Sequence, residues 1–165
     1  ALFHQERVLI IKGKERLKAR GCGGRNAHNY LSLYLKFSTD SYLIKIDPDT
    51  DVNHAPTLPP KFDIACNFVE GSLRGGAIAF SRNAVQTIVN SQLLLDEKYQ
   101  ELRWCYRWRN TEWIPCEDAI LYDVIQRLGL NLVYWQDVYC RHRQEAFNPP
   151  DSLNTYSFYH PISDQ

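Results

Sequence analysis

Tyr-Leu-Ile-Lys-Ile-Asp-Pro-Asp-Thr-Asp, residues 42–51, is the stretch that decides the fold. An apolar run over residues 41–46 is typical of a buried strand, and it stops abruptly at Asp47. Three acids then stand at alternate positions, Asp47, Asp49 and Asp51. In α/β proteins ligands bind beyond the carboxyl ends of the strands. The stretch therefore predicts a ligand site at the end of a buried strand.

Segments with strand and helix patterns alternate on both sides of this stretch. Ser81 is expected to cap one helix at its N-terminus, and Gly129 to end another. The glycine-rich residues 21–24 are expected to break the chain before the first helix. The predicted strands are 7–12, 41–46, 62–68, 77–80, 132–134 and 138–140, and the predicted helices are 26–37, 82–95 and 115–128.

This alternation predicts the α/β class, with a mostly parallel sheet flanked by helices. Of the 165 residues, 44% are hydrophobic and 23% charged, which suits a globular domain with a core. We expect one domain over residues 1–165. From about residue 148 onward Pro, Ser, Asn and Asp dominate, so we expect an irregular tail there.

The charge balance argues against a nucleic-acid partner. There are 19 basic and 19 acidic residues, and such a chain has no global field that attracts nucleic acid or an anionic membrane. No run approaches the roughly 18 apolar residues of a transmembrane segment, and no signal peptide is visible. The 5 cysteines are scattered without a CxxC pair. We therefore expect reduced thiols and a cytoplasmic protein.

Two explanations fit the acids of residues 47–51. A divalent cation that prefers oxygen ligands would relieve their mutual repulsion and would share its coordination with substrate phosphates. Alternatively, the acids form a solvated turn after the strand, because Asp and Pro are both common in turns. A calcium loop is excluded, because its sixth position needs Gly and its twelfth Glu, and Val52 and Leu58 stand there.

Three segments resemble one family in the same order. Residues 42–50 look like the DxD strand of GT-A fold glycosyltransferases. Residues 75–81, Gly-Gly-Ala-Ile-Ala-Phe-Ser, and residues 116–121, Cys-Glu-Asp-Ala-Ile-Leu, resemble segments of the fringe and β-1,3-galactosyltransferase-like branch. The resemblance implies a GT-A-like, Rossmann-like sheet. Few residues precede Asp47, so we expect this domain to lack its first N-terminal strand and the chain to be incomplete.

The resemblance also implies a metal site for the donor diphosphate. Asp47 and Asp49 would hold Mn²⁺ or Mg²⁺, and Asp47 would also contact the ribose or sugar of the donor. A late His is often a further ligand in the family. His142 follows a predicted strand and is the first choice, with His160 in reserve.

The acidic pair at the start of the predicted helix 115–128 implies the catalytic base. Asp118 would take the proton from the acceptor hydroxyl, which implies inversion at the anomeric carbon. Glu117 is the competing candidate, because the sequence does not separate two adjacent acids. The alternative is that the pair simply complements the helix dipole.

Further binding residues follow from the same reasoning. Gly75 and Gly76 would let the backbone approach the donor sugar or the acceptor closely, or would form a plain turn. Arg25 precedes a predicted helix N-terminus, which is a natural anion site. The Trp- and Arg-rich residues 102–113 would stack on the acceptor sugar and pair with phosphate, or would form core and a solvated face.

The function predicted is transfer of a sugar from a nucleotide-sugar, expected to be a UDP-sugar, to the hydroxyl of a glycan or other acceptor. One alternative is a non-catalytic module of the same family that binds a nucleotide-sugar or glycan. Another is a nucleotidyltransferase, whose strand-end acids also hold Mg²⁺.

Overall fold

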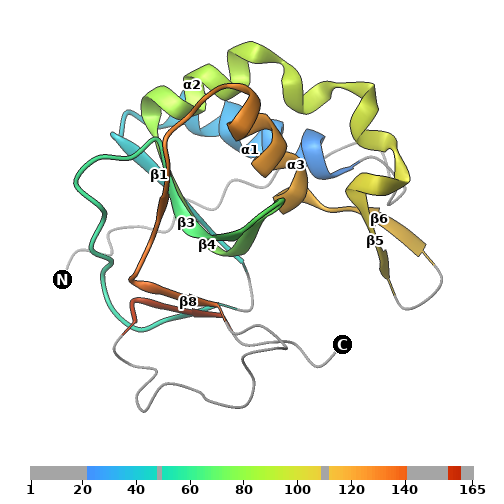
Figure 1. The fold of residues 1–165 in the computed structure, drawn as a ribbon. Coiled ribbons are helices and arrows are strands. Elements are labelled where there is room, and N and C mark those ends of the chain that lie inside the picture. Colours follow the sequence, from blue (N-terminus) through green and yellow to red (C-terminus); the bar gives the residue numbers. More distant parts are fainter. Residues whose placement is uncertain (1–21, 48–49, 109–111, 141–155, 161–165) are drawn as a thin grey trace.

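The computed structural model describes residues 22–47, 50–108, 112–140 and 156–160, and it belongs to the α/β class (Figure 1). Three helices lie on one face of a four-stranded sheet, and a three-stranded sheet lies on the other (Figure 1). The helices are α1 (Cys22–Phe37), α2 (Arg82–Ser91) and α3 (Glu117–Arg127), and the short 3-10 helices are η1 (Leu93–Leu95), η2 (Glu97–Gln100) and η3 (Leu102–Trp104). The strands are β1 (Tyr42–Ile46), β2 (Asp51–Val52), β3 (Ile64–Val69), β4 (Ser72–Ser81), β5 (Cys105–Trp108), β6 (Glu112–Pro115), β7 (Leu132–Tyr134), β8 (Val138–Cys140) and β9 (Phe158–His160).

The main sheet is mixed, so the prediction of a mostly parallel sheet was wrong. Its strand order is β1-β4-β3-β7. Strand β4 is antiparallel to both of its neighbours, while β3 and β7 are parallel. Consequently β1, β3 and β7 run in the same direction, and their carboxyl ends share one edge of the sheet.

A tight hairpin between β3 and β4 reverses the chain and explains the error. Val69 pairs with Ser72, and Gly71 between them has a φ of 86°, a conformation that favours glycine. A plain turn at Gly75 and Gly76 was one of the two interpretations of that glycine pair. Both glycines lie inside β4, where its register with β3 shifts between Arg74 and Ile78.

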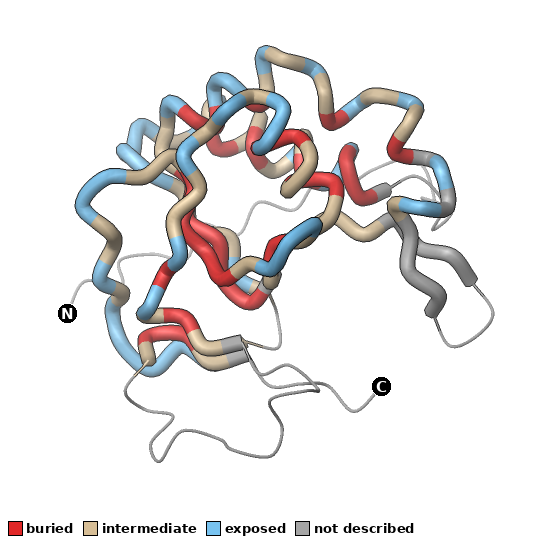
Figure 2. Tube along the Cα trace, in the orientation of Figure 1, coloured by how far each residue is buried: buried red, intermediate tan, exposed pale blue. Residues whose placement is uncertain are grey.

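The strands β3 and β4 are buried on both faces (Figure 2). Along β4, Ile78 and Phe80 pack into the cluster beneath the helices, whereas Ala77 and Ala79 face the smaller sheet. Large side chains thus fill the helix side. Only small ones fit on the side where Trp135 lies.

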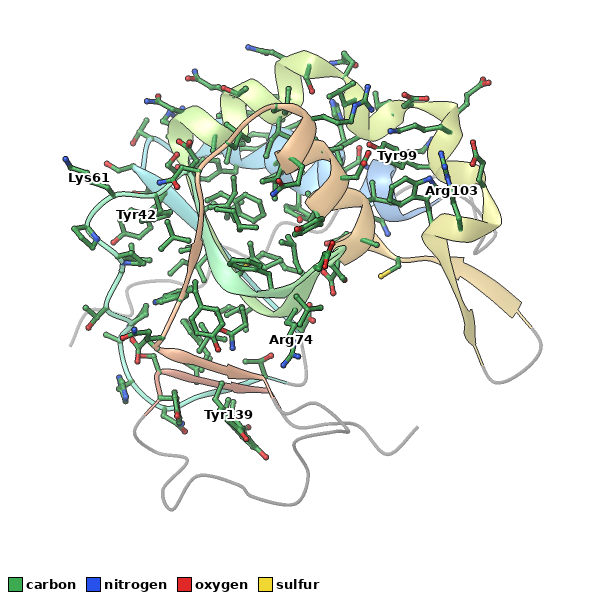
Figure 3. All side chains as sticks on the ribbon, in the orientation of Figure 1. Tyr42, Lys61, Arg74, Tyr99, Arg103 and Tyr139 are labelled. Carbon is green, nitrogen blue, oxygen red and sulfur yellow. The ribbon has the colours of Figure 1, made fainter. Side chains whose placement is uncertain are left out.

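The smaller sheet has the order β2-β9-β8 and joins distant parts of the chain. Strand β9 is antiparallel to β2 and parallel to β8. Its Phe158 is buried and packs edge-on against Trp135, with ring centroids 5.4 Å apart. The tail predicted to be irregular therefore contains a core strand. Tyr139 lies on the opposite side of this sheet from β4 and stacks with Tyr159 (Figure 3).

The three predicted helices are present, but α1 begins before residue 26 and α2 ends at Ser91 instead of residue 95. Gln92, with a φ of 58°, ends α2, and the 3-10 helix η1 follows it. Ser81 caps α2 by accepting a hydrogen bond from the Ala84 amide, and Gly129, with a φ of 63°, follows the end of α3. The glycine-rich segment does not break the chain, because α1 includes Gly24. A Cβ added at this position would lie 2.1 Å from the carbonyl oxygen of Leu94 in η1. Gly24 is thus a close-packing residue.

The strand predicted at residues 7–12 lies outside the described residues, so it stays a prediction. In the part of the chain that the structure describes, no helix has the length and apolar character needed to cross a bilayer.

Replacement of Gly24 by Ala separates packing from helix propensity. Propensity alone would make this change stabilising by about 1 kcal/mol. Because the new methyl group meets backbone rather than a movable side chain, we expect destabilisation of about 1–3 kcal/mol instead. Urea denaturation measures the difference, with Arg25→Ala at an exposed position of the same helix as the control. A more stable Gly24→Ala protein would contradict the packing of α1 against η1.

Candidate functional site

The end of β1 and the glycine pair of β4 lie side by side. The Asp47 amide donates a hydrogen bond to the Gly76 carbonyl oxygen at 3.1 Å. The Thr50 hydroxyl donates to the same oxygen at 2.9 Å. Two of the three segments that resemble the glycosyltransferase family are therefore adjacent, because Ile46 and Ala77 pair across β1 and β4.

The third segment meets the first through Lys45. The Lys45 ammonium nitrogen lies 2.5 Å from Oδ1 of Asp47 and 3.6 Å from Oε1 of Glu117. Lys45 pairs with Ile78, whose side chain is on the helix side of the sheet, so Lys45 points to that side as well. Helix α3 begins on this side. A single cation therefore joins acids from the end of β1 and the first turn of α3.

Helix α1 adds a tyrosine to this group. The Tyr30 hydroxyl donates a hydrogen bond to Oε1 of Glu117 at 3.2 Å. Glu117 thus accepts from Tyr30 and faces Lys45 through the same oxygen. We call Tyr30, Lys45, Asp47, Glu117 and Asp118 the acid cluster.

Burial and charge set the protonation of the cluster. Burial raises the pKa of Glu117; Lys45 and the Tyr30 hydrogen bond oppose this rise, and the charge of Asp47 adds to it. Burial, together with Glu117, raises the pKa of Tyr30 well above its usual value, so Tyr30 remains a donor. Burial alone would lower the pKa of Lys45, but its hydrogen bond with Asp47 and the nearby acids raise it overall.

Asp118 belongs to the same group by its electrostatic effect. It follows Glu117 in the first turn of α3 and is half-buried. Its charge raises the pKa of both Tyr30 and Lys45. The two candidates for the catalytic base therefore both act on the groups next to Asp47. The helix-dipole explanation also holds, since both acids are in the first turn.

Arg25 is not at this location. It is exposed near the start of α1, five residues before Tyr30. At roughly 100° per residue, the two side chains point about 140° apart around the helix axis. The polar contacts found among the described residues of the acid cluster do not include Arg25.

The structure describes only some of the predicted metal ligands. Asp49 and His142 lie outside the described residues, and His160 is in β9. Within the described ranges, no three His, Cys, Asp or Glu side chains come together to hold a metal ion.

One backbone hydrogen bond supports the explanation that the acids of residues 47–51 form a turn. The Thr50 amide donates to the Asp47 carbonyl oxygen at 3.0 Å, the spacing of a turn of four residues. Asp51 is exposed in β2. Asp47, in contrast, is half-buried and paired with Lys45, so the acids of this run lie in different surroundings.

The Trp- and Arg-rich segment is described at its beginning. Trp104 is partly buried against the helix-side core and packs edge-on against Tyr99, with centroids 5.2 Å apart. Arg103 is exposed, pairs with Glu101 at 2.8 Å and stacks on Trp104 (Figure 3). Trp104 therefore belongs to the core and Arg103 to a solvated face, as the second of the two explanations for this segment expects. Strands β5 and β6 pair as an antiparallel hairpin beyond them.

The sequence reasoning missed Lys45 and Tyr30 as members of the site. Lys45 is the one charged residue in the apolar run 42–46, and a charge there signals a buried partner. Tyr30 stands at helical spacing with the apolar residues Ala27, Leu31 and Tyr34, a pattern that indicates core packing and not a site. Only the packing of α1 on α3 brings its hydroxyl to Glu117.

No protein-family model matches the chain, and comparisons with curated proteins and with solved structures found no match. The resemblance to glycosyltransferases therefore remains a prediction, and the geometry of the acid cluster carries the functional argument.

Replacement of Glu117 by Gln tests the raised pKa of this carboxyl. The pKa of Glu117 is higher in the folded chain than in the unfolded chain, where it is near 4.5. Such a carboxyl contributes its full stability to the folded state below pH 4.5, and this contribution is lost as the pH rises through the folded pKa. We expect the unfolding free energy of the wild-type protein, minus that of Glu117→Gln, to fall over this window. Urea denaturation from about pH 4 to about pH 8 measures it.

The control is Glu97→Gln, the same chemical change at an exposed position of η2. A difference for Glu117→Gln that stays flat or grows with pH would contradict the burial of Glu117 as the dominant effect.

Proposed function

We propose that the chain is a GT-A-like domain of a metal-dependent glycosyltransferase that transfers a sugar from a UDP-sugar to an acceptor hydroxyl with inversion. The supporting observation is the Lys45 ammonium, which lies between Asp47 and Glu117 and joins two segments far apart in the sequence. The segment of residues 75–81 is adjacent to Asp47 through Gly76. The common direction of β1, β3 and β7 supports a Rossmann-like arrangement with the site at their carboxyl ends.

Asp47 and Asp49 are the residues proposed to hold Mn²⁺ or Mg²⁺ on the donor diphosphate. The cation would supply Lewis acidity, stabilising the negative charge that the leaving diphosphate gains. Asp47 is suited to this role because its carboxylate is fixed at the sheet edge and remains partly accessible, with 26% of the side chain exposed. The buried Gly76 backbone beside it holds the end of β1 in place, because its carbonyl oxygen accepts hydrogen bonds from the Asp47 amide and the Thr50 hydroxyl.

Asp118 or Glu117 is the proposed general base. It would take the proton of the acceptor hydroxyl as that oxygen bonds to the anomeric carbon and the bond from this carbon to the diphosphate oxygen breaks. A raised pKa brings a carboxylate closer to the strength needed near neutral pH, which supports Glu117. Asp118 is the acid that the family resemblance favours, and its half-buried position in the first turn of α3 is compatible with contact to an acceptor.

A second candidate is a non-catalytic module that binds a nucleotide-sugar or glycan. The observation in its favour is the internal pairing of Glu117 with Lys45 and Tyr30, which is also what a structural ion pair would show. Under this proposal the metal pair is kept and the acids of α3 do no chemistry.

Thermal unfolding with Mn²⁺ and UDP tests the proposed donor site. At a ligand concentration of about 100 times its dissociation constant, binding to the folded chain adds about 2.7 kcal/mol. For a chain of this size we expect the midpoint to rise by roughly 5–10 °C with Mn²⁺ and UDP together, and far less with either alone. Asp47→Asn and Asp49→Asn should each abolish the rise.

Asp51→Asn is the matched control, because it is the same change in the same acidic run at an exposed residue of β2. It should keep the rise in the unfolding midpoint. Loss of the rise in all three variants, or no rise in the wild-type protein with UDP, GDP or ADP, would count against the donor site.

Replacement of Asp118 by Asn separates the enzyme from the binding module. If Asp118 is the base, we expect turnover of UDP-sugar to fall by about 10²–10⁴-fold, the usual range for general base catalysis, while the Mn²⁺ and UDP stabilisation remains. Glu117→Gln is assayed in parallel to decide between the two acids. Release of UDP from a panel of UDP-sugars measures turnover. Unchanged turnover in both variants would contradict both acids as the base, whereas stabilisation by Mn²⁺ and UDP without turnover in the wild-type protein would favour the binding module.

A further inference from the structure

Lys45 is an unusual residue for its position. It stands in a strand whose neighbouring side chains pack into the core, and only 21% of its own side chain is exposed. An ammonium group at such a place is costly unless anionic partners compensate for the lost hydration. Asp47 and Glu117 provide that compensation. The acid cluster thus contains its own cation.

The two contacts of this ammonium are unequal. Its nitrogen is 2.5 Å from Asp47, at hydrogen-bond distance, and 3.6 Å from Glu117, within ion-pair range but longer than a hydrogen bond. Glu117 is held in place by Tyr30, which donates a hydrogen bond to the same Oε1. A shift of the ammonium of about 1 Å therefore exchanges the close partner from Asp47 to Glu117.

We propose that Lys45 is an internal counter-ion that competes with the divalent cation for Asp47, and that it moves to Glu117 when the cation and nucleotide bind. This inference rests on the proposed function, because it assumes that Asp47 receives a cation. Lys45 is a positioning residue in this scheme and touches neither the acceptor nor the anomeric carbon. In the first state Lys45 is the close partner of Asp47; in the second the metal is on Asp47 and Lys45 is the close partner of Glu117.

The consequence is discrimination against the bare cation. The apparent affinity of a ligand falls by the fraction of molecules that are competent to bind it. If Lys45 occupies Asp47 about nine-tenths of the time, cation alone binds about tenfold more weakly than it would to the free carboxylate. The diphosphate adds ligands that overcome this competition, so the site favours a cation that arrives with its nucleotide.

The experiment measures Mn²⁺ binding to the full chain without nucleotide, by following the electron paramagnetic resonance signal of free Mn²⁺. We expect Lys45→Met to bind Mn²⁺ about tenfold more tightly than the wild-type protein. Lys45→Gln, whose shorter neutral side chain also leaves Asp47 free, should show the same increase in Mn²⁺ affinity. It replaces Lys45→Met in the experiment if the Met variant does not fold. Lys45→Arg keeps the charge and should bind as weakly as the wild-type protein.

Lys98→Met is the control for loss of a lysine in general. Lys98 pairs with Asp123 at 2.8 Å with similar exposure, but the pair lies between η2 and α3 rather than at Asp47. Its removal should leave the Mn²⁺ affinity unchanged.

The outcomes separate this inference from the proposed function. Equal Mn²⁺ affinity in the wild-type, Lys45→Met and Lys45→Gln proteins would overturn the competition by Lys45, while a rise of the melting midpoint with Mn²⁺ and UDP would still support the donor site. Absence of Mn²⁺ binding in every variant, with and without UDP, would overturn both. Tighter binding only in the two neutral variants of Lys45 supports the inference.

Discussion

Burial of β4 on both faces is the constraint on which the other elements depend. Its side chains alternate between the helix layer and the smaller sheet, so every position must suit one of two different neighbours. On one face Phe80 and Ile78 supply the volume that helices need. On the other, Ala77 and Ala79 leave room for the indole of Trp135. Because large and small residues alternate, the strand fits between its two layers in only one register.

The same strand determines where the acid cluster forms. Its pairing with β1 brings the strand-end acid Asp47 to the Gly76 carbonyl, and its helix face supports the layer that contains α3. The cluster therefore lies where a sheet edge meets a helix N-terminus. The backbone on both sides fixes the positions of Asp47 and Glu117, and the long side chain of Lys45 faces both carboxyls. Such rigidity suits a site that must hold charges at set separations.

Local patterns predicted local structure well but did not predict the distant pairings. The strand before Asp47 and the cap at Ser81 were correct because adjacent residues decide them. The predicted sheet direction was wrong because a two-residue turn that contains Gly71 reverses the chain between β3 and β4, where alternation of strands and helices had indicated a parallel sheet. For the site, the three segments could be found by resemblance. The hydroxyl of Tyr30 could not, since only packing between α1 and α3 brings it to Glu117.

The pairing of β2 with β9 has a consequence for how the chain reaches this structure. Asp51 lies opposite Tyr159, and the Asn53 amide donates to the Ser157 carbonyl. The segment that follows the strand-end acids is thus anchored by residues made much later on the ribosome. Contacts of such long sequence separation form slowly, because a large loop must close first. During synthesis, the helix layer can assemble on β3 and β4 while this segment still lacks its partner strand.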